Sequence, residues 1–250
     1  MSLSYAILTL NEAAEIDACI RSLGPAEEVL LLDSGSTDAT LPIAAVAAQG
    51  MPFPLRVEQR PFRDYADQRN AALKLLHTDW VFFVDADERS SVEQTAEVAT
   101  RIRATDAPAG FWVPRANIIF GHRMRHTGWS PDYQLRLFQT RRGRYDSERP
   151  VHELVQLDGR AEHLQTPLTH FNYRRVGQFV AKQRRYAGHE AQQRLRAGER
   201  VRPRALLSLP AREVYRRYIT LAGWRDGGHG LLLSVLMGWY RLLVAREMRG

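Results

Sequence analysis

The sequence predicts an α/β fold, in which a mostly parallel sheet is flanked by helices and followed by a helical C-terminal extension. Three observations support this prediction. Apolar, strand-like runs alternate with helix-like segments over the first hundred residues, which favours parallel strands joined by right-handed crossovers. Polar or acidic residues follow three of these runs directly. From Val176 onward the chain has helical spacing and is rich in arginine.

The elements of the first hundred residues can be assigned in order. Each strand-like run is aliphatic or β-branched, and each segment that follows has apolar residues at helical spacing. Asn11 can cap the first helix, and Gly24-Pro25 ends it. The predicted strands are Ser4–Thr9, Glu28–Asp33, Leu55–Glu58 and Trp80–Val84, and the predicted helices are Ile16–Leu23, Thr40–Gln49, Tyr65–His77 and Val92–Ala104.

The chain changes character at Gly110. Short strand-like runs are mixed with aromatic residues and arginines, which predicts an antiparallel or mixed extension of the sheet. The basic helical region that follows has predicted breaks at Pro203 and Pro210. We therefore expect a domain over residues 1–175 and a helical extension over residues 176–250. The runs of the mixed region are Gly110–Arg115, Ile118–Gly121, Gln134–Phe138 and Val151–Val155, closed by His170-Phe171.

Composition limits the class of protein. A chain of 250 residues can bury a large core. Its one cysteine, Cys19, excludes an internal disulfide framework and any cysteine-based zinc site. The net charge of +7 favours anionic partners such as nucleotides, phospholipid surfaces or acidic glycans. The start of the chain lacks a basic signal-peptide region and no uninterrupted apolar run has the length of a membrane span, so we expect a cytoplasmic protein.

The polar residues at three strand ends predict one site. Strands of a parallel sheet end at the same edge, and ligands of open α/β sheets bind there. In extended backbone Asp85 and Asp87 would project to the same side and offer oxygen ligands to Mg²⁺ or Mn²⁺. A solvated turn is the alternative explanation for this pair alone. The three clusters are Thr9–Glu12, Asp33–Asp38 and Asp85–Glu88.

Several motifs resemble those of the family 2 inverting glycosyltransferases, which have the GT-A fold. Their order and spacing match over residues 4 to 90, and later segments resemble the branch that includes lipopolysaccharide core β-glucosyltransferases. The early motifs are Thr9-Leu10-Asn11-Glu12, Asp33-Ser34-Gly35-Ser36-Thr37-Asp38, Gln68-Arg69-Asn70 and Asp85-Ala86-Asp87-Glu88. The later ones are Arg136-Leu137-Phe138, Val151-His152-Glu153, His170 and Asp226-Gly227-Gly228-x-Gly230.

The resemblance implies an enzyme that uses a nucleotide-diphosphate sugar and a divalent cation, Mg²⁺ or Mn²⁺. Residues 1–100 would form the Rossmann-like nucleotide-sugar half, and residues 101–175 the mixed-sheet half for acceptor and metal. Asp87, Asp85 and His170 would hold the metal, which neutralises the leaving diphosphate; His170 could instead be structural. The residues expected to contact the donor are Thr9, Asn11, Glu12, Asp33, Asp38, Gln68, Asn70 and Asp85, with Arg136 on the diphosphate.

An inverting transfer needs one general base, which takes the proton of the acceptor hydroxyl. Many family members use an Asp in a Glu-Asp pair, which is missing from the expected region. Glu153 is therefore the first candidate, with a surface salt bridge as its alternative, and Asp132 is the second. Gln134-Leu135-Arg136 falls short of the Gln-x-x-Arg-Trp signature of processive synthases, so we expect transfer of a single sugar.

The basic C-terminal region predicts contact with an anionic membrane surface, where arginines would face headgroups. The apolar segments that would embed are Leu231–Leu233, Val235–Met237 and Trp239-Tyr240. An ordinary helix pair or a dimer interface is the alternative.

The expected protein is thus a peripheral enzyme on the cytoplasmic face of the inner membrane. It would move a hexose, with UDP as the expected carrier, to a glycolipid or lipopolysaccharide-core hydroxyl. One alternative is transfer to polyprenyl phosphate. The other is a basic nucleotide- or nucleic-acid-binding module without activity, although acids at three strand ends disfavour binding to nucleic acid.

Overall fold

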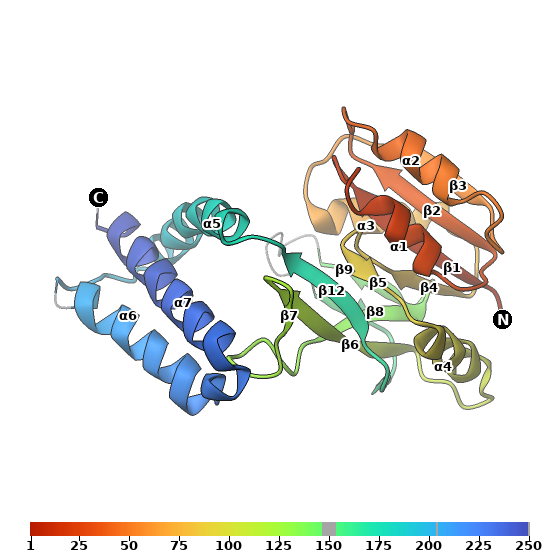
Figure 1. Cartoon of the computed structure of the whole chain (residues 1–250). Helices are drawn as coiled ribbons and strands as arrows, with labels where there is room; N and C mark the ends of the chain where they lie inside the picture. The colour runs from red at the N-terminus through yellow and green to blue at the C-terminus, as the bar shows by residue number, and fades with distance from the viewer. Residues whose placement is uncertain (147–153, 204, 250) are drawn as a thin grey trace. The chain divides into compact units, whose positions relative to one another are not determined.

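The computed structural model describes residues 1–146, 154–203 and 205–249 (Figure 1). The chain divides into two compact units. Unit 1 consists of Met1–Arg115 and Tyr133–His170, and unit 2 consists of Ala116–Asp132 and Phe171–Gly250. The functional boundary expected at residue 175 remains a prediction.

The first half of unit 1 alternates strands and helices as predicted, with boundaries that differ by only a few residues. Its strands belong to one sheet. The elements are β1 (Leu3–Thr9), α1 (Ile16–Ser22), β2 (Glu28–Asp33), α2 (Thr40–Ala47), β3 (Leu55–Gln59), α3 (Tyr65–Leu75), β4 (Trp80–Phe83), β5 (Glu88–Arg89) and α4 (Val92–Arg103).

The parallel part of the sheet is buried on both faces. β1 lies between β2 and β4 and pairs parallel with both, and β3 pairs parallel with β2. Ile7, Leu31 and Phe82 face the side covered by α1, α2 and α4, whereas Leu30 and Phe83 face the side covered by α3. Continuous burial of this kind is typical of parallel strands covered by helices on both faces.

Most of the remaining strands form the predicted mixed extension, and β9 and β10 form a separate two-stranded sheet. β8 pairs antiparallel with β4 and with β6, and β12 pairs antiparallel with β5. The sheet has the order β3-β2-β1-β4-β8-β6-β12-β5. The strands are β6 (Gly110–Ile119), β7 (His122–Arg123), β8 (Tyr133–Gln139), β9 (Gly143–Tyr145), β10 (Val155–Leu157), β11 (Ala161–His163) and β12 (Leu168–Tyr173).

Of the strands predicted for this region, two form one strand and one lies mostly outside the described residues. The runs Gly110–Arg115 and Ile118–Gly121 were predicted as separate strands but lie largely in the single strand β6, because the buried Ala116 and Asn117 continue it. Most of the predicted strand Val151–Val155 lies outside the described residues, and Val155 begins β10, which pairs with β9.

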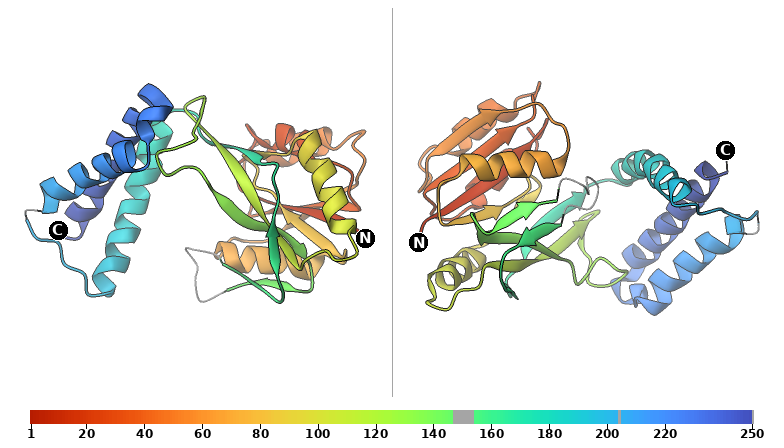
Figure 2. Two further views of the ribbon diagram at one scale, coloured as in Figure 1. Left: turned by 90° about the horizontal axis from the view of Figure 1, so that it is seen from below. Right: turned by 180° about the vertical axis from the view of Figure 1, so that it is seen from behind.

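Unit 2 is mainly helical. Its long helices are α5 (Val176–Arg196), α6 (Ala205–Tyr215) and α7 (Gly227–Glu247), with a π-helical turn at Arg216–Thr220 and a 3₁₀ turn at Gly223–Asp226. α6 and α7 run side by side in every view (Figure 1, Figure 2), and α7 also packs against α5 through an apolar cluster.

The break expected at Pro210 is wrong, because Pro210 lies inside α6. A proline removes one helical hydrogen bond, and packing along α7 compensates for this loss by holding α6 in place. The break near Pro203 is confirmed, since α5 ends at Arg196 and α6 begins at Ala205.

The segment Gly223–Glu247 has the length and apolar composition of a membrane span, and it is the single such helix in the part of the chain that the structure describes. Charged residues such as Arg225, Asp226 and Arg241 interrupt this segment, so the expectation that no uninterrupted apolar run has the length of a membrane span is not contradicted. The core helices of soluble proteins pass the same test of length and composition.

Gly238 permits the close approach of α7 to α6. A Cβ atom there would lie 2.7 Å from Val214 Cγ2 and 3.1 Å from the carbonyl oxygen of Pro210. We expect Gly238→Ala to lower the free energy of unfolding by about 1–3 kcal/mol, because overpacking outweighs the gain in helix propensity.

The matched control is Gly188→Ala in α5, where no atom beyond the adjacent residues and the backbone of the same helix lies within 4 Å of the added Cβ among the described residues. It should raise the stability by up to about 1 kcal/mol. Urea unfolding followed by circular dichroism measures both values. Equal stabilisation by the two alanines would contradict the close approach.

Candidate active site

The carboxyl ends of β1 and β2 are joined by hydrogen bonds to Asp33. Thr9 Oγ1 donates to Asp33 Oδ1 over 3.1 Å, and the backbone N–H groups of Gly35 and Ser36 donate to Asp33 Oδ2. Burial alone would raise the pKa of Asp33, but these donors and the Ser36 hydroxyl outweigh it and lower the pKa. The turn needs Gly35, whose φ of +96° lies in the left-handed region. Asp33 therefore holds the turn together.

The loops after these two strands also hold each other. Asn11 Oδ1 accepts a hydrogen bond from the backbone N–H of Thr37 over 2.8 Å, and the backbone N–H of Glu12 donates to Thr40 Oγ1 over 2.7 Å. Asp38 accepts from the Thr40 backbone N–H over 3.0 Å, and hydrogen bonds from Thr40 lower its pKa. The predicted meeting of the first two polar clusters is confirmed.

The third strand end is fixed by an ion pair between Asp85 and Arg136 of β8. Arg136 Nη1 and Nη2 donate to Asp85 Oδ1 and Oδ2 over 3.0 and 2.6 Å, and Arg69 Nη2 lies 3.3 Å from Asp85 Oδ1. Burial would raise the pKa of Asp85, but the two guanidinium charges outweigh it and hold the pKa well below its usual range.

Arg136 and Asp85 are each other's partners in this structure, because the Arg136 side chain is only 7% exposed and a buried guanidinium requires an ionised acceptor. The expected roles of Arg136 on the diphosphate and of Asp85 at the ribose or metal remain predictions.

Asp87 has a different environment. The chain turns at Ala86 and Asp87, and the backbone N–H of Glu88 donates to the carbonyl oxygen of Asp85 over 2.9 Å, so the extended geometry assumed for Asp85 and Asp87 is wrong. Asp87 Oδ2 instead lies 3.4 Å from Nε2 of His170, which β12 places opposite Glu88.

The pair of Asp87 and His170 fits a divalent cation. Two ligand atoms about 2.1 Å from one ion stand roughly 3.0–3.4 Å apart in octahedral or tetrahedral coordination. Within residues 1–146, 154–203 and 205–249, no group of three or more His, Cys, Asp or Glu side chains is placed to hold a metal ion. Asp87 and His170 could therefore supply two ligands of a metal ion, and the remaining ligands would have to come from elsewhere.

The charge around Asp87 also favours a cation. Burial, and then the negative charge of Asp87, raise the pKa of Glu12 to about 7, and Glu15 and Asp38 add to the effect. Negative charges from all three strand ends therefore act on Glu12, which shows that the third cluster joins the first two.

The two amides of α3 have structural partners. Gln68 Nε2 donates to Ser34 Oγ and to the Arg60 carbonyl oxygen, each over 3.0 Å, and its Oε1 accepts from Arg60 Nη1. Asn70 exchanges two hydrogen bonds of 2.9 Å with the backbone of Tyr145. In this structure their polar groups brace the Ser34 turn and β9, and their expected contact with the donor remains a prediction.

Two residues acquire roles that the sequence did not assign. Arg69 lies over the rings of Phe83 and Tyr145 and contacts Asp85. Glu88 is fully buried, and its Oε2 accepts from the Asp85 backbone N–H over 2.9 Å. The one signal for Glu88 is its position directly after Asp87.

The base candidates are placed differently. Glu153 lies outside the described residues. Asp132 belongs to unit 2, where its Oδ2 accepts a hydrogen bond from Nδ2 of the buried Asn117 over 2.9 Å. Asn117 Nδ2 also donates to the Trp129 carbonyl oxygen, so the amide joins both ends of the loop 129–132. Both catalytic roles remain predictions.

Comparison with known proteins assigns the family. Residues 4–153 match the family model described as Glycosyl transferase family 2. The lipopolysaccharide core biosynthesis glycosyltransferase LpsC of Rhizobium meliloti (strain 1021) is 30% identical over 254 residues, which cover 99% of this chain and 92% of LpsC. An uncharacterized glycosyltransferase of Rickettsia bellii is 36% identical over 97 residues, and the match covers 38% of this chain and 31% of that protein.

The chain therefore belongs to glycosyl transferase family 2 and is a glycosyltransferase. Its fold is similar to that of S. aureus TarS residues 1–349, with a TM-score of 0.52, 16% identity, and coverage of 100% of this chain and 89% of that one. The predicted GT-A fold is confirmed, and the alternative of a binding module without enzymatic activity is wrong.

The two acids of the Asp85–Asp87 turn should separate in their effects on stability. Asp85→Asn removes the ionised partner of the buried Arg136, so we expect it to lower the free energy of unfolding by about 2–3 kcal/mol. Among the described residues Asp87→Asn affects only the 3.4 Å contact with His170, so it should stay within about 0.5 kcal/mol of the wild type. Urea unfolding measures both variants, and equal losses would show that Asp85 is not the structural member.

Proposed function

We propose that this chain is a metal-dependent inverting glycosyltransferase that moves one sugar from a nucleotide-diphosphate sugar, UDP-hexose being the expected donor. The acceptor would be a hydroxyl of a glycolipid or lipopolysaccharide-core type. One observation carries the proposal: three polar strand ends meet at one sheet edge, where Asp87 faces His170. Asp85 and Glu88 act there by fixing the turn that presents Asp87.

The donor nucleotide would lie along the ends of β1 and β2. Asn11, Glu12 and Asp38 offer amide and carboxylate groups that can hydrogen-bond a base or ribose. Thr9 and Asp33 would support these residues without contacting the nucleotide, because they bond to each other and Asp33 bonds to the turn after β2. This division follows from burial, because Asn11 and Asp38 are exposed and Glu12 is half-buried, whereas Thr9 and Asp33 are buried.

Asp87 and His170 would hold the divalent cation, and the diphosphate would supply further oxygen ligands. The bound cation would neutralise the charge that develops on the leaving diphosphate. A diphosphate would otherwise be repelled by the carboxylates of Glu12, Asp38 and Asp87. The surplus of acids at this edge thus supports a requirement for metal.

One general base must then take the acceptor proton as the hydroxyl attacks the anomeric carbon. Glu153 remains the first candidate and Asp132 the second. Asp132 is restrained by its bond to Asn117, which suits a base that must be held in one orientation.

The acceptor proposal is supported by the extent of the match to LpsC, whose name refers to lipopolysaccharide core biosynthesis. Exposed apolar side chains in unit 2 support contact with an anionic membrane, because they are accompanied by arginines such as Arg225. They include Ile219, Trp224, Leu231 and Val235, each 46–53% exposed. The helical region 176–250 would be the membrane-facing extension, and the enzyme would lie on the cytoplasmic face of the inner membrane.

Calorimetric titration with UDP tests the donor site. We expect binding that depends on Mn²⁺ and is weakened about tenfold or more in Asp87→Asn and His170→Ala, because each variant removes a metal ligand. The control is Arg184→Gln, an exposed change in α5. Binding that persists without metal, or unchanged in Asp87→Asn, would refute the metal site. If the wild type does not bind UDP, the titration is repeated with GDP, CMP and dTDP. Absence of binding to all four nucleotides would overturn the donor proposal.

Single-turnover kinetics test the base and the acceptor. Either Glu153→Gln or Asp132→Asn should lower the rate of transfer by about 10²–10⁴-fold while leaving UDP affinity unchanged. NMR of the product should show one added sugar with inverted anomeric configuration. If both variants keep full activity, neither residue is the base. Transfer to polyprenyl phosphate but not to a lipopolysaccharide-core glycolipid would overturn the proposed acceptor.

A further inference from the structure

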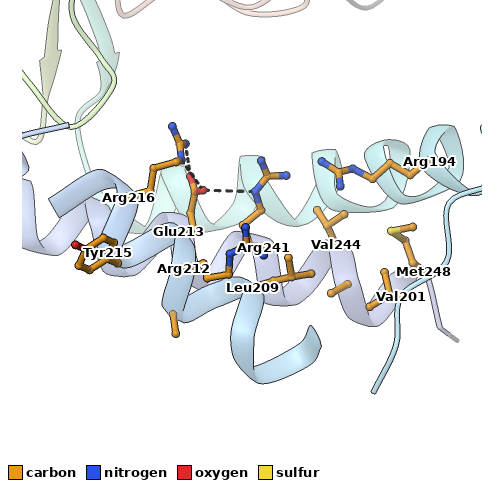
Figure 3. Close-up of a pocket in the computed structure, with 12 residues that line it drawn as sticks. Arg194, Val201, Leu209, Arg212, Glu213, Tyr215, Arg216, Arg241, Val244 and Met248 are labelled. Atoms are coloured by element: carbon orange, nitrogen blue, oxygen red, sulfur yellow. Dashed lines mark hydrogen bonds and ion pairs between the residues drawn. The ribbon is translucent and has the colours of Figure 1, made fainter. Parts of the chain in front are cut away.

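A pocket of about 730 Å³ lies among the three long helices of unit 2 (Figure 3). Twelve residues line it, of which four are arginines and one is an acid. The charged residues are Arg194, Arg212, Arg216, Arg241 and Glu213. This pocket plays no part in the proposed transfer chemistry, and its excess of positive charge requires a separate explanation.

The other side of the pocket is aliphatic. Val244 and Met248 of the α7 end are buried, Leu209 comes from α6, and Val201 comes from the segment that joins α5 to α6. Figure 3 shows Arg216, Arg241 and Arg194 along one edge, with these aliphatic side chains beside them. The pocket therefore combines a cationic edge with an apolar wall.

Two carboxylates, the buried Glu213 and the half-buried Glu190, orient the arginines. Glu190 accepts from Arg194 and from Arg241, over 2.7 and 3.0 Å, and Glu213 accepts from Arg216 over 2.8 Å. Burial would raise the pKa of Glu213, but hydrogen bonds from Arg216 and Arg217 outweigh it and lower the pKa to about 2. Both acids are thus held in position, which restricts the rotamers of the guanidinium groups before any ligand binds.

Arg212 differs from the other three. It is exposed and makes no hydrogen bond or ion pair within the part of the chain that the structure describes. Its five donors are therefore available to a ligand at no cost to an existing bond. The pocket thus contains one unused guanidinium beside three that are positioned by acids.

We propose that this pocket binds a phosphate-bearing acyl lipid, of the kind that gives a membrane its negative charge. The arginines would bind the phosphate, because a guanidinium fork matches phosphate oxygens, and the acyl chain would cover the aliphatic wall. The volume falls within the range of ligand sites. The inference rests on the proposed membrane contact for the source of its ligand, and is independent of the sugar-transfer chemistry.

Other ligands complement only one side of the pocket. Inorganic phosphate would satisfy the arginines but leave the wall of Val201, Leu209 and Val244 uncovered. A lipid without phosphate would cover that wall but leave the positive charge uncompensated, and in a zwitterionic lipid the cationic headgroup would offset the phosphate charge. Tyr215, which is 63% exposed, also lines the pocket and adds a ring with a polar tip, as is common at membrane interfaces.

Titration of the full chain with short-chain lipids below their micellar concentration tests the proposal without a membrane. The probes are dihexanoyl phosphatidylglycerol, dihexanoyl phosphatidylcholine and inorganic phosphate. We expect the first to bind about tenfold more tightly than the others. Arg212→Gln with Arg216→Gln should weaken its binding by about tenfold, the effect of losing charge-assisted hydrogen bonds.

The matched control is Arg184→Gln with Arg185→Gln, which removes the same charge from exposed positions of α5 outside the pocket. It should change the lipid affinity less than twofold. Arg212→Gln alone serves as the variant that breaks no bond of the fold, and should show a smaller loss in the same direction. Mn²⁺-dependent UDP binding by every variant should remain unchanged, which separates this test from that of the donor site.

Three results would overturn the proposal. Equal affinity for inorganic phosphate and phosphatidylglycerol would mean a simple anion site. Equal loss in the control and pocket variants would mean general electrostatic attraction to unit 2. Absence of binding by the wild-type chain would mean that the arginines serve only the packing of the helices.

Discussion

The ion pair between Asp85 and Arg136 is the interaction on which the active-site edge depends. β8 pairs antiparallel with β4, which places Arg136 beside the residues that follow β4. Because the guanidinium is buried, it requires an ionised partner, and Asp85 supplies it. Glu88 then bonds to the backbone N–H of Asp85, and the chain turns between them. The result is that Asp87 Oδ2 lies 3.4 Å from His170 Nε2.

Within the motif Asp85–Glu88, Asp85 pairs with arginines, whereas Asp87 remains part of an acidic site. The two arginines near Asp85 compensate that carboxylate, whereas burial and then the negative charge of Asp87, with smaller effects of Glu15 and Asp38, raise the pKa of Glu12. Unit 2 has the opposite balance, since arginines outnumber acids around its pocket. A net charge of +7 therefore conceals an acidic edge in one unit and a basic surface in the other. The net charge alone would have indicated only the basic surface.

The sequence predicted the fold well because burial and periodicity are local signals. The runs that became β1, β2 and β4 are apolar throughout, and their shared edge follows from parallel pairing. The hydrogen-bond partner of a side chain cannot be predicted from neighbouring residues, because it can lie far away in the sequence. Asn70 bonds to a residue 75 positions away, and Arg136 to one 51 positions away. Residue type could therefore place these side chains near the site, but could not decide whether their polar atoms were already occupied there.

The mean hydropathy of helix α7 likewise does not show which of its sides are buried. Its apolar composition meets the criteria for a membrane span, yet its apolar residues divide between two sides. Leu233, Tyr240 and Val244 are buried within unit 2, while Leu231 and Val235 are about half exposed. A helix that crosses a bilayer needs most of its circumference in contact with lipid or with other apolar segments, whereas one that lies at the interface needs a single apolar side. In the proposed membrane contact α7 would therefore lie along the surface, because its other side already holds α5 and α6 together.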